Sequence, residues 1–134
     1  MTDTPKIQVD RLFTHPPAAV WRALTSPELI ARWWAPGDVR AELGHRFTLD
    51  MGPWGVQACE VTAVEPERLL QYKYAIGVLD TLITWRLAPE GKGTRLTLVH
   101  EGFKLDTPMG KRAFEGMKPG WPGVVGAIER VLNG

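Results

Sequence analysis

The residue types that most often perform chemistry are scattered in this sequence rather than grouped. Its three histidines, His15, His45 and His100, stand in separate segments without the i, i+4 or HExxH spacing that presents zinc ligands. The sole serine, Ser26, fits a helix cap better than the nucleophile of a Ser-His-Asp triad. The sole cysteine, Cys59, reads as a small thiol in mid-strand. We therefore expect no catalytic residue, no metal and no cofactor.

Large rings that each carry one polar atom are frequent in the segments expected to face the interior. Buried tyrosine and tryptophan need hydrogen-bond partners for their O–H and N–H groups, so several on one face indicate a few fixed polar groups in an apolar pocket. Small-molecule sites have that character. The alternative is that each ring only fills the core. The rings concerned are Trp54, Tyr72, Tyr74, Trp85 and Trp121.

Two adjacent tryptophans, Trp33 and Trp34, end a helical pattern in the stretch ARWWAPGD. Neighbouring side chains on a helix point about 100° apart, so one apolar face cannot easily bury both. Leu29 and Ile30 lie one turn before Trp33, which therefore continues the buried stripe. We expect Trp34 at the rim, as a lip of the cavity or as part of a contact surface.

Two polar side chains share a strand face with apolar ones. Arg11 shares a strand face with Val9 and Phe13. If that face is inward, the charge of Arg11 must be paired or lie at the cavity edge. The alternative is a surface arginine near a strand end. His100 shares the face of Leu96 and Leu98 and reads as a core histidine with satisfied hydrogen bonds rather than a general base.

Composition argues against several classes of protein. The 134 residues fit one domain, 1–134, and sixteen basic against fifteen acidic residues leave a charge of +1, which gives little support to nucleic-acid or membrane-surface binding. One cysteine forms no intramolecular disulfide, and neither a signal peptide nor an apolar run long enough for a membrane span is expected. These features favour a cytoplasmic protein.

Alternation of apolar and polar residues predicts strands with one buried face. Prolines and capping residues predict two short helices after the first strand, over 17–24 and 27–34. Such alternation is typical of an antiparallel sheet with one covered side. About seven strands are expected, over 6–13, 39–43, 47–51, 54–64, 70–74, 83–87 and 96–101.

The last segment predicts the helix that covers this sheet. Apolar residues recur at spacings of three and four from Phe114 to Leu132. Pro119 lacks an N–H and Pro122 suits a new first turn, so we expect helix over 108–118, a break or sharp kink at 119–121, and helix again to 132. The result is an α+β domain of two layers.

The order of these elements and several motifs resemble the START-like SRPBCC superfamily, whose helix-grip fold is shared with the birch-pollen allergen. Within it, the chain resembles the bacterial activator of heat-shock-protein-90 ATPase homologues (the Aha1 C-terminal domain-like family). Relatives usually have Gly-Gly where this chain has Gly44-His45, and fewer prolines in the last helix. The resemblance rests on FTHPPAAVWRALTSPELIARWW, VEPERLLQY, GTRLTLVHEGF and the late GW pair.

The resemblance implies a curved antiparallel sheet of six to seven strands that grips a long C-terminal helix, with two short helices after strand 1 and a deep cavity between sheet and long helix. Members of the superfamily bind or process hydrophobic small molecules. We expect the cavity to be lined by Trp34, Phe47, Leu49, Met51, Trp54, Tyr72, Tyr74, Trp85, His100, Phe114, Met117, Trp121 and Val125.

Three functions follow as hypotheses. The first is a binding protein for a hydrophobic small molecule, with no metal. The second is an enzyme of the polyketide cyclase or aromatase type, in which Arg11, Tyr72, Tyr74 or His100 supplies polarity to an apolar substrate. The third is a chaperone-interacting module, as the family name suggests. Fold-level likeness does not decide among them.

Overall fold

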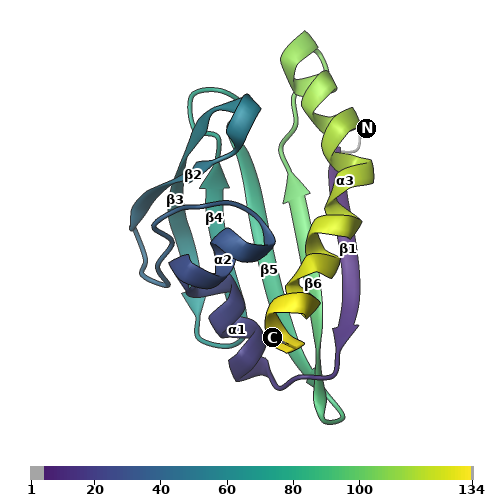
Figure 1. Cartoon of the computed structure of the whole chain (residues 1–134). Helices are drawn as coiled ribbons and strands as arrows, with labels where there is room; N and C mark the ends of the chain where they lie inside the picture. The colour runs from purple at the N-terminus through teal and green to yellow at the C-terminus, as the bar shows by residue number, and fades with distance from the viewer. Residues whose placement is uncertain (1–4, 134) are drawn as a thin grey trace.

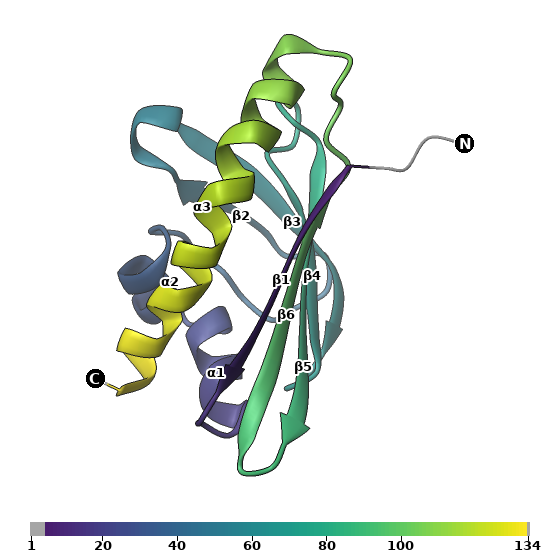
Figure 2. The ribbon, with the colours of Figure 1, turned by 90° about the vertical axis from the view of Figure 1, so that its right-hand side faces the viewer.

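One six-stranded antiparallel sheet organises the molecule, with its strands in the order β1-β6-β5-β4-β3-β2. The computed structural model describes residues 5–133. All three α-helices lie on one side of the curved sheet, and α3 runs diagonally across it (Figures 1 and 2). The elements are β1 (Lys6–Phe13), α1 (Pro17–Thr25), α2 (Pro27–Trp33), β2 (Arg46–Asp50), the 3₁₀ turn η1 (Gly52–Trp54), β3 (Val56–Glu65), β4 (Leu69–Tyr74), β5 (Thr81–Glu90), β6 (Gly93–Glu101) and α3 (Pro108–Asn133).

The alternating pattern places the core on the covered side of this sheet. In β6, Leu96, Leu98 and His100 are fully buried beneath the helices, whereas Arg95 faces solvent. Successive strand residues point to opposite faces, so one face becomes apolar and the other polar. The helix-grip α+β fold expected from the sequence is confirmed, with six strands.

Both short helices begin with a proline in their first turn, and α2 also has a capping side chain. Pro17 and Pro27 occupy first-turn positions, and the Ser26 hydroxyl accepts a hydrogen bond from the Leu29 N–H at 3.4 Å. Trp33 is buried, and its indole N–H donates to the Ala23 carbonyl at 2.8 Å, which ties α2 to α1. The prediction that Trp33 belongs to the core is confirmed.

The strand predicted over 39–43 is wrong. This segment forms bends and turns, its Leu43 is 73% exposed, and only Gly37 makes an isolated bridge, to Leu49 of β2. A Cβ at Gly37 would lie 2.3 Å from the Thr48 carbonyl oxygen, so the chain approaches β2 closely there and then turns away. The alternation of apolar and polar residues over 39–43 produced no strand, because this segment has no hydrogen-bonded partner strand. The strand predicted from Trp54 likewise begins later, at Val56.

Of the two alternatives predicted at 119–121, the break is wrong, because α3 continues from Pro108 to Asn133 with Pro119 and Pro122 inside it, while the kink stays a prediction. Both prolines face solvent, where a carbonyl that loses its helical partner can bond to water. The same turn buries Trp121 against the sheet, and this packing outweighs the local preference to break. In the part of the chain described, no helix is long and apolar enough to span a membrane.

Candidate functional site

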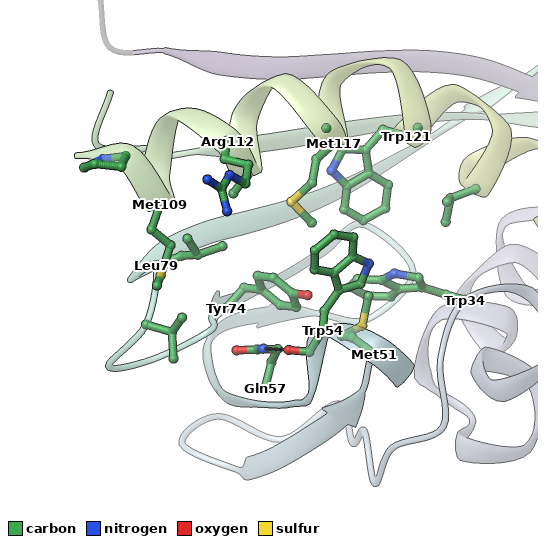
Figure 3. Close-up of a pocket in the computed structure, with 16 residues that line it drawn as sticks. Trp34, Met51, Trp54, Gln57, Tyr74, Leu79, Met109, Arg112, Met117 and Trp121 are labelled. Carbon is green, nitrogen blue, oxygen red and sulfur yellow. Dashed lines mark hydrogen bonds between the residues drawn. The ribbon is translucent and has the colours of Figure 1, made fainter. Parts of the chain in front are cut away.

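A cavity of about 680 Å³ lies between α3, over residues 108–124, and the end of the sheet that carries Gln57 and Tyr74 (Figure 3). Its walls come from α3, the end of α2, the η1 turn, β3, β4 and the turn that follows β4. The wall is mostly apolar. It consists of Trp34, Met51, Trp54, Gln57, Tyr74, Val78, Leu79, Pro108, Met109, Arg112, Ala113, Gly116, Met117, Gly120, Trp121 and Val124.

Trp34 joins the core to this cavity. Its ring stacks on Trp33, with centroids 5.8 Å apart, and on Tyr74 at 5.9 Å, and it packs against Trp121 at 5.1 Å. It is half-buried and forms part of the cavity wall. The second tryptophan of the pair therefore carries the aromatic packing of the core out to the wall, which agrees with the expected rim position.

A chain of hydrogen bonds behind the wall holds Trp121 in place. The indole N–H of Trp121 donates to Nδ1 of His100 at 3.0 Å, and Nε2 of His100 lies 2.8 Å from the Thr81 hydroxyl. An indole only donates, so Nδ1 accepts and Nε2 carries the proton. The Thr81 hydroxyl donates onward to the Tyr74 carbonyl at 3.2 Å. Burial lowers the pKa of His100 to about 3, so this imidazole is neutral and fully engaged, as the sequence suggested.

A second buried pair lies deeper in the core. The Trp85 indole N–H donates to the Tyr72 hydroxyl at 3.0 Å, and both residues are fully buried. Burial, the dominant cause, holds the pKa of Tyr72 well above its usual range. This pair supports the sheet beneath the cavity and is not part of its wall.

The thirteen residues expected to line the cavity divide into two groups. Those on its wall are Trp34, Met51, Trp54, Tyr74, Met117 and Trp121. Those placed elsewhere are Phe47, Leu49, Tyr72, Trp85, His100, Phe114 and Val125, of which all but Phe114 are buried. Phe114 packs against Phe103, with ring centroids 5.2 Å apart, beside the cavity.

Sequence reasoning missed most of the α3 wall. Met109, Arg112, Gly116 and Gly120 recur at spacings of three and four, beside Met117 and Trp121, which are four residues apart. Extending the helical period back to Met109 would have found this stripe. The turn at 76–79, which supplies Val78 and Leu79, has no periodic signal.

Trp54 sits at the mouth of the cavity rather than on the buried sheet face. It ends the η1 turn, where Gly55 follows with a φ of 87°, and its side chain is 76% exposed. Val78 and Met109, also exposed, share this mouth. The mouth is thus framed by apolar side chains in contact with water.

Three polar side chains interrupt the apolar wall. The Gln57 amide N–H donates to the Trp54 carbonyl at 2.9 Å, while its buried Oε1 has no protein partner. Tyr74 presents its hydroxyl from β4, and burial, the largest cause, raises the pKa of this phenol. Arg112 extends from α3 on the cavity side (Figure 3). A few such groups in an apolar wall can orient a ligand.

Other polar residues singled out in the sequence lie away from the cavity. Arg11 lies on the edge strand β1 and pairs with Glu129 of α3 at 2.7 Å, and 41% of its side chain is exposed. It is therefore paired, as the first alternative expected, and at the surface, as the second did. Burial raises the pKa of the Cys59 thiol to about 12, so it is a poor nucleophile at neutral pH. Within residues 5–133, no three His, Cys, Asp or Glu side chains are close enough to hold a metal ion.

Solved structures of similar proteins share this fold. Protein MLL2253 from Mesorhizobium loti is 37% identical, with a TM-score of 0.87 over 96% of this chain and 97% of that one. Protein BH1534 from Bacillus halodurans is 31% identical, with a TM-score of 0.85 over 98% and 99% of the two chains. DynU16, a protein in the dynemicin biosynthetic locus, is 25% identical, with a TM-score of 0.82 over 98% of this chain and 48% of its own.

A comparison with curated proteins found no match. The family model described as activator of Hsp90 ATPase homolog 1-like protein matches residues 14–133, nearly the whole chain. The chain therefore belongs to the activator of Hsp90 ATPase homolog 1-like family within the SRPBCC superfamily.

Proposed function

We propose that the protein binds an apolar small molecule in the cavity between α3 and the sheet. The observation that carries the proposal is a mostly apolar cavity of about 680 Å³ with three polar side chains on its wall. Ligand sites in proteins have volumes of roughly 300–1,000 Å³ and the same balance of apolar lining and few polar groups. A similar protein, DynU16, belongs to the biosynthetic locus of a small molecule, which is in keeping with this function.

The cavity mouth gives a second reason for a ligand. Trp54, Val78 and Met109 keep large apolar surfaces in water around the opening. Covering apolar surface is favourable by about 25 cal/mol per Å². A ligand that fills the cavity and contacts this mouth would gain that free energy without disturbing the packed core behind Trp34.

Binding fits the cavity wall better than acid–base catalysis does. The side chains on the wall that bear an acidic or basic group are Tyr74 and Arg112. General acid–base catalysis works best with a group whose pKa is close to the operating pH, and burial moves the pKa of Tyr74 further above neutrality. His100 is turned toward Trp121 and Thr81, and its lone pair is already engaged.

The experiment is a titration with N-phenyl-1-naphthylamine, a neutral dye whose emission rises in apolar surroundings, combined with thermal unfolding. A ligand that binds only the folded state stabilises it by roughly 2.7 kcal/mol at a hundredfold excess over its Kd. We expect saturable dye binding and a higher Tm. If neither the dye nor a broad panel of apolar and aromatic compounds raises the Tm, the proposal fails.

A matched pair of exposed side chains locates the binding. Trp54→Ala removes a ring at the mouth and should weaken dye binding with little effect on stability, because this side chain is already in water. Leu43→Ala removes a comparably exposed apolar side chain that does not line the cavity and should leave dye binding unchanged. Equal effects of the two substitutions would place the dye outside the cavity.

A further inference from the structure

Arg112 is the only charged residue on the cavity wall among the residues described. It lies in the first half of α3, one turn after Met109 and one turn before Gly116. Its guanidinium hangs from the helix toward the cavity, on the same side as Tyr74 (Figure 3). An arginine offers five N–H donors in a planar fork, which matches the geometry of a carboxylate.

The guanidinium of Arg112 has no acidic partner within residues 5–133. None of the ion pairs or side-chain hydrogen bonds in this part of the chain involves it. The acid of the neighbouring turn, Asp80, accepts from the Gly77 N–H at 2.8 Å and lies 3.9 Å from the Lys104 ammonium. A cation therefore stands beside an apolar cavity with its donors available.

We propose that the ligand is a carboxylic acid with an apolar body, held with its carboxylate on Arg112 and its body against the rings of Trp34, Tyr74 and Trp121. The inference rests on the proposed function and adds the chemical class of the ligand. Charge-assisted bidentate hydrogen bonds between arginine and a carboxylate are shorter and stronger than neutral ones. An anion at the mouth also keeps its remaining hydration, while the apolar body leaves water.

Three unbranched twelve-carbon compounds that differ in their head group test the charge of the ligand. Dodecanoate and dodecylammonium below their micelle concentrations, and dodecanol below its solubility limit, are used to displace N-phenyl-1-naphthylamine from the protein. An exposed ion pair is worth up to about a fivefold change in affinity. We expect dodecanoate to bind about fivefold more tightly than dodecanol, and dodecylammonium to bind most weakly.

Two substitutions assign this preference to one residue. Arg112→Gln removes the cation on the cavity wall, and Lys111→Gln removes the same charge from the adjacent, solvent-facing position. In Arg112→Gln, the affinity for dodecanoate should fall to that for dodecanol, and the affinity for dodecanol should stay unchanged. Lys111→Gln should keep the preference for dodecanoate.

The outcomes separate this inference from the proposed function. Equal affinity of dodecanoate and dodecanol for the unmodified protein overturns the carboxylate inference, and so does a preference that persists in Arg112→Gln; in both cases apolar binding stands. A dye that binds but is displaced by none of the three compounds also overturns the inference. Failure of the dye and of all three compounds to bind overturns the proposed function itself.

Discussion

Replacing Gly116 with leucine should close part of the cavity from inside while leaving the fold intact. Gly116 lies on the α3 wall, and a Cβ added there meets no atom within 4 Å. The new side chain brings four carbon atoms into space that a ligand would otherwise occupy. At about 0.3 kcal/mol per displaced non-hydrogen atom of a drug-sized ligand, affinity should fall close to tenfold.

The free energy of unfolding of the same variant should rise, although its affinity falls. Glycine inside a helix is less favourable than alanine by about 1 kcal/mol, and leucine is nearly as good a helix former as alanine. Gly116→Leu should therefore raise the free energy of unfolding by up to about 1 kcal/mol. Weaker binding by a more stable protein cannot be attributed to damage of the fold.

Gly123→Leu is the control for this substitution. Gly123 lies on the same helix, is exposed, and has the same free space around an added Cβ, but it does not line the cavity. Both variants are titrated with N-phenyl-1-naphthylamine and unfolded in urea. Only Gly116→Leu should lose affinity, while both gain stability. Unchanged dye binding by Gly116→Leu, or equal losses in the two variants, would refute the location of the ligand beneath α3.

Three further results are expected. Trp85→Ala should lower the free energy of unfolding in urea by about 3–5 kcal/mol, because it empties a fully buried site and leaves the Tyr72 hydroxyl without its donor. Lys73→Ala alters an exposed side chain and should change the free energy of unfolding by less than about 0.5 kcal/mol. Folding lowers the pKa of His100 from 6.5 to about 3, so the unfolded chain takes up this proton first as pH falls. The free energy of unfolding should therefore drop by roughly 1 kcal/mol between pH 7.5 and 5.5, and His100→Gln should flatten that slope. Added to a heat-shock-protein-90 chaperone, the protein should not increase ATP turnover, since a near-zero net charge gives weak electrostatic steering; a several-fold saturable increase would contradict this.

The sequence predicted the parts of the fold that depend on local patterns. Ser26 and Pro27 mark a helix start, and alternation in β6 identifies its buried face, because capping and side-chain direction are set by near neighbours. The segment 39–43 shows the limit of that reasoning: alternation needs a hydrogen-bonded partner to become a strand, and pairing is a long-range property. Pro119 shows the same limit for helices, since burial of Trp121 decides the continuity of α3.

The cavity wall was predictable only in part, for a different physical reason. Alternation tells which face of a strand is buried, but not whether a helix or empty space lies above it. Tyr72 and Tyr74 share one face of β4, yet only Tyr74 reaches the wall, because α3 crosses the sheet obliquely (Figure 2) and the cavity lies at the Tyr74 end of β4. The turn at 76–79 contains a left-handed Gly77 and directly follows a left-handed Ala75, conformations that no periodicity reveals.

The hydrogen bonds behind the wall explain how an open cavity coexists with a rigid core. A void beside aromatic rings would normally invite them to collapse into it, because rings that line empty space lose dispersion contacts. Trp121 cannot turn inward without leaving the Nδ1 of His100, a buried acceptor whose unpaired state costs about 1–3 kcal/mol. Trp34 is held in a similar way by stacking on Trp33 and Tyr74. The buried histidine thus holds Trp121 in the cavity wall without being part of that wall, and its loss should loosen the wall before it unfolds the protein.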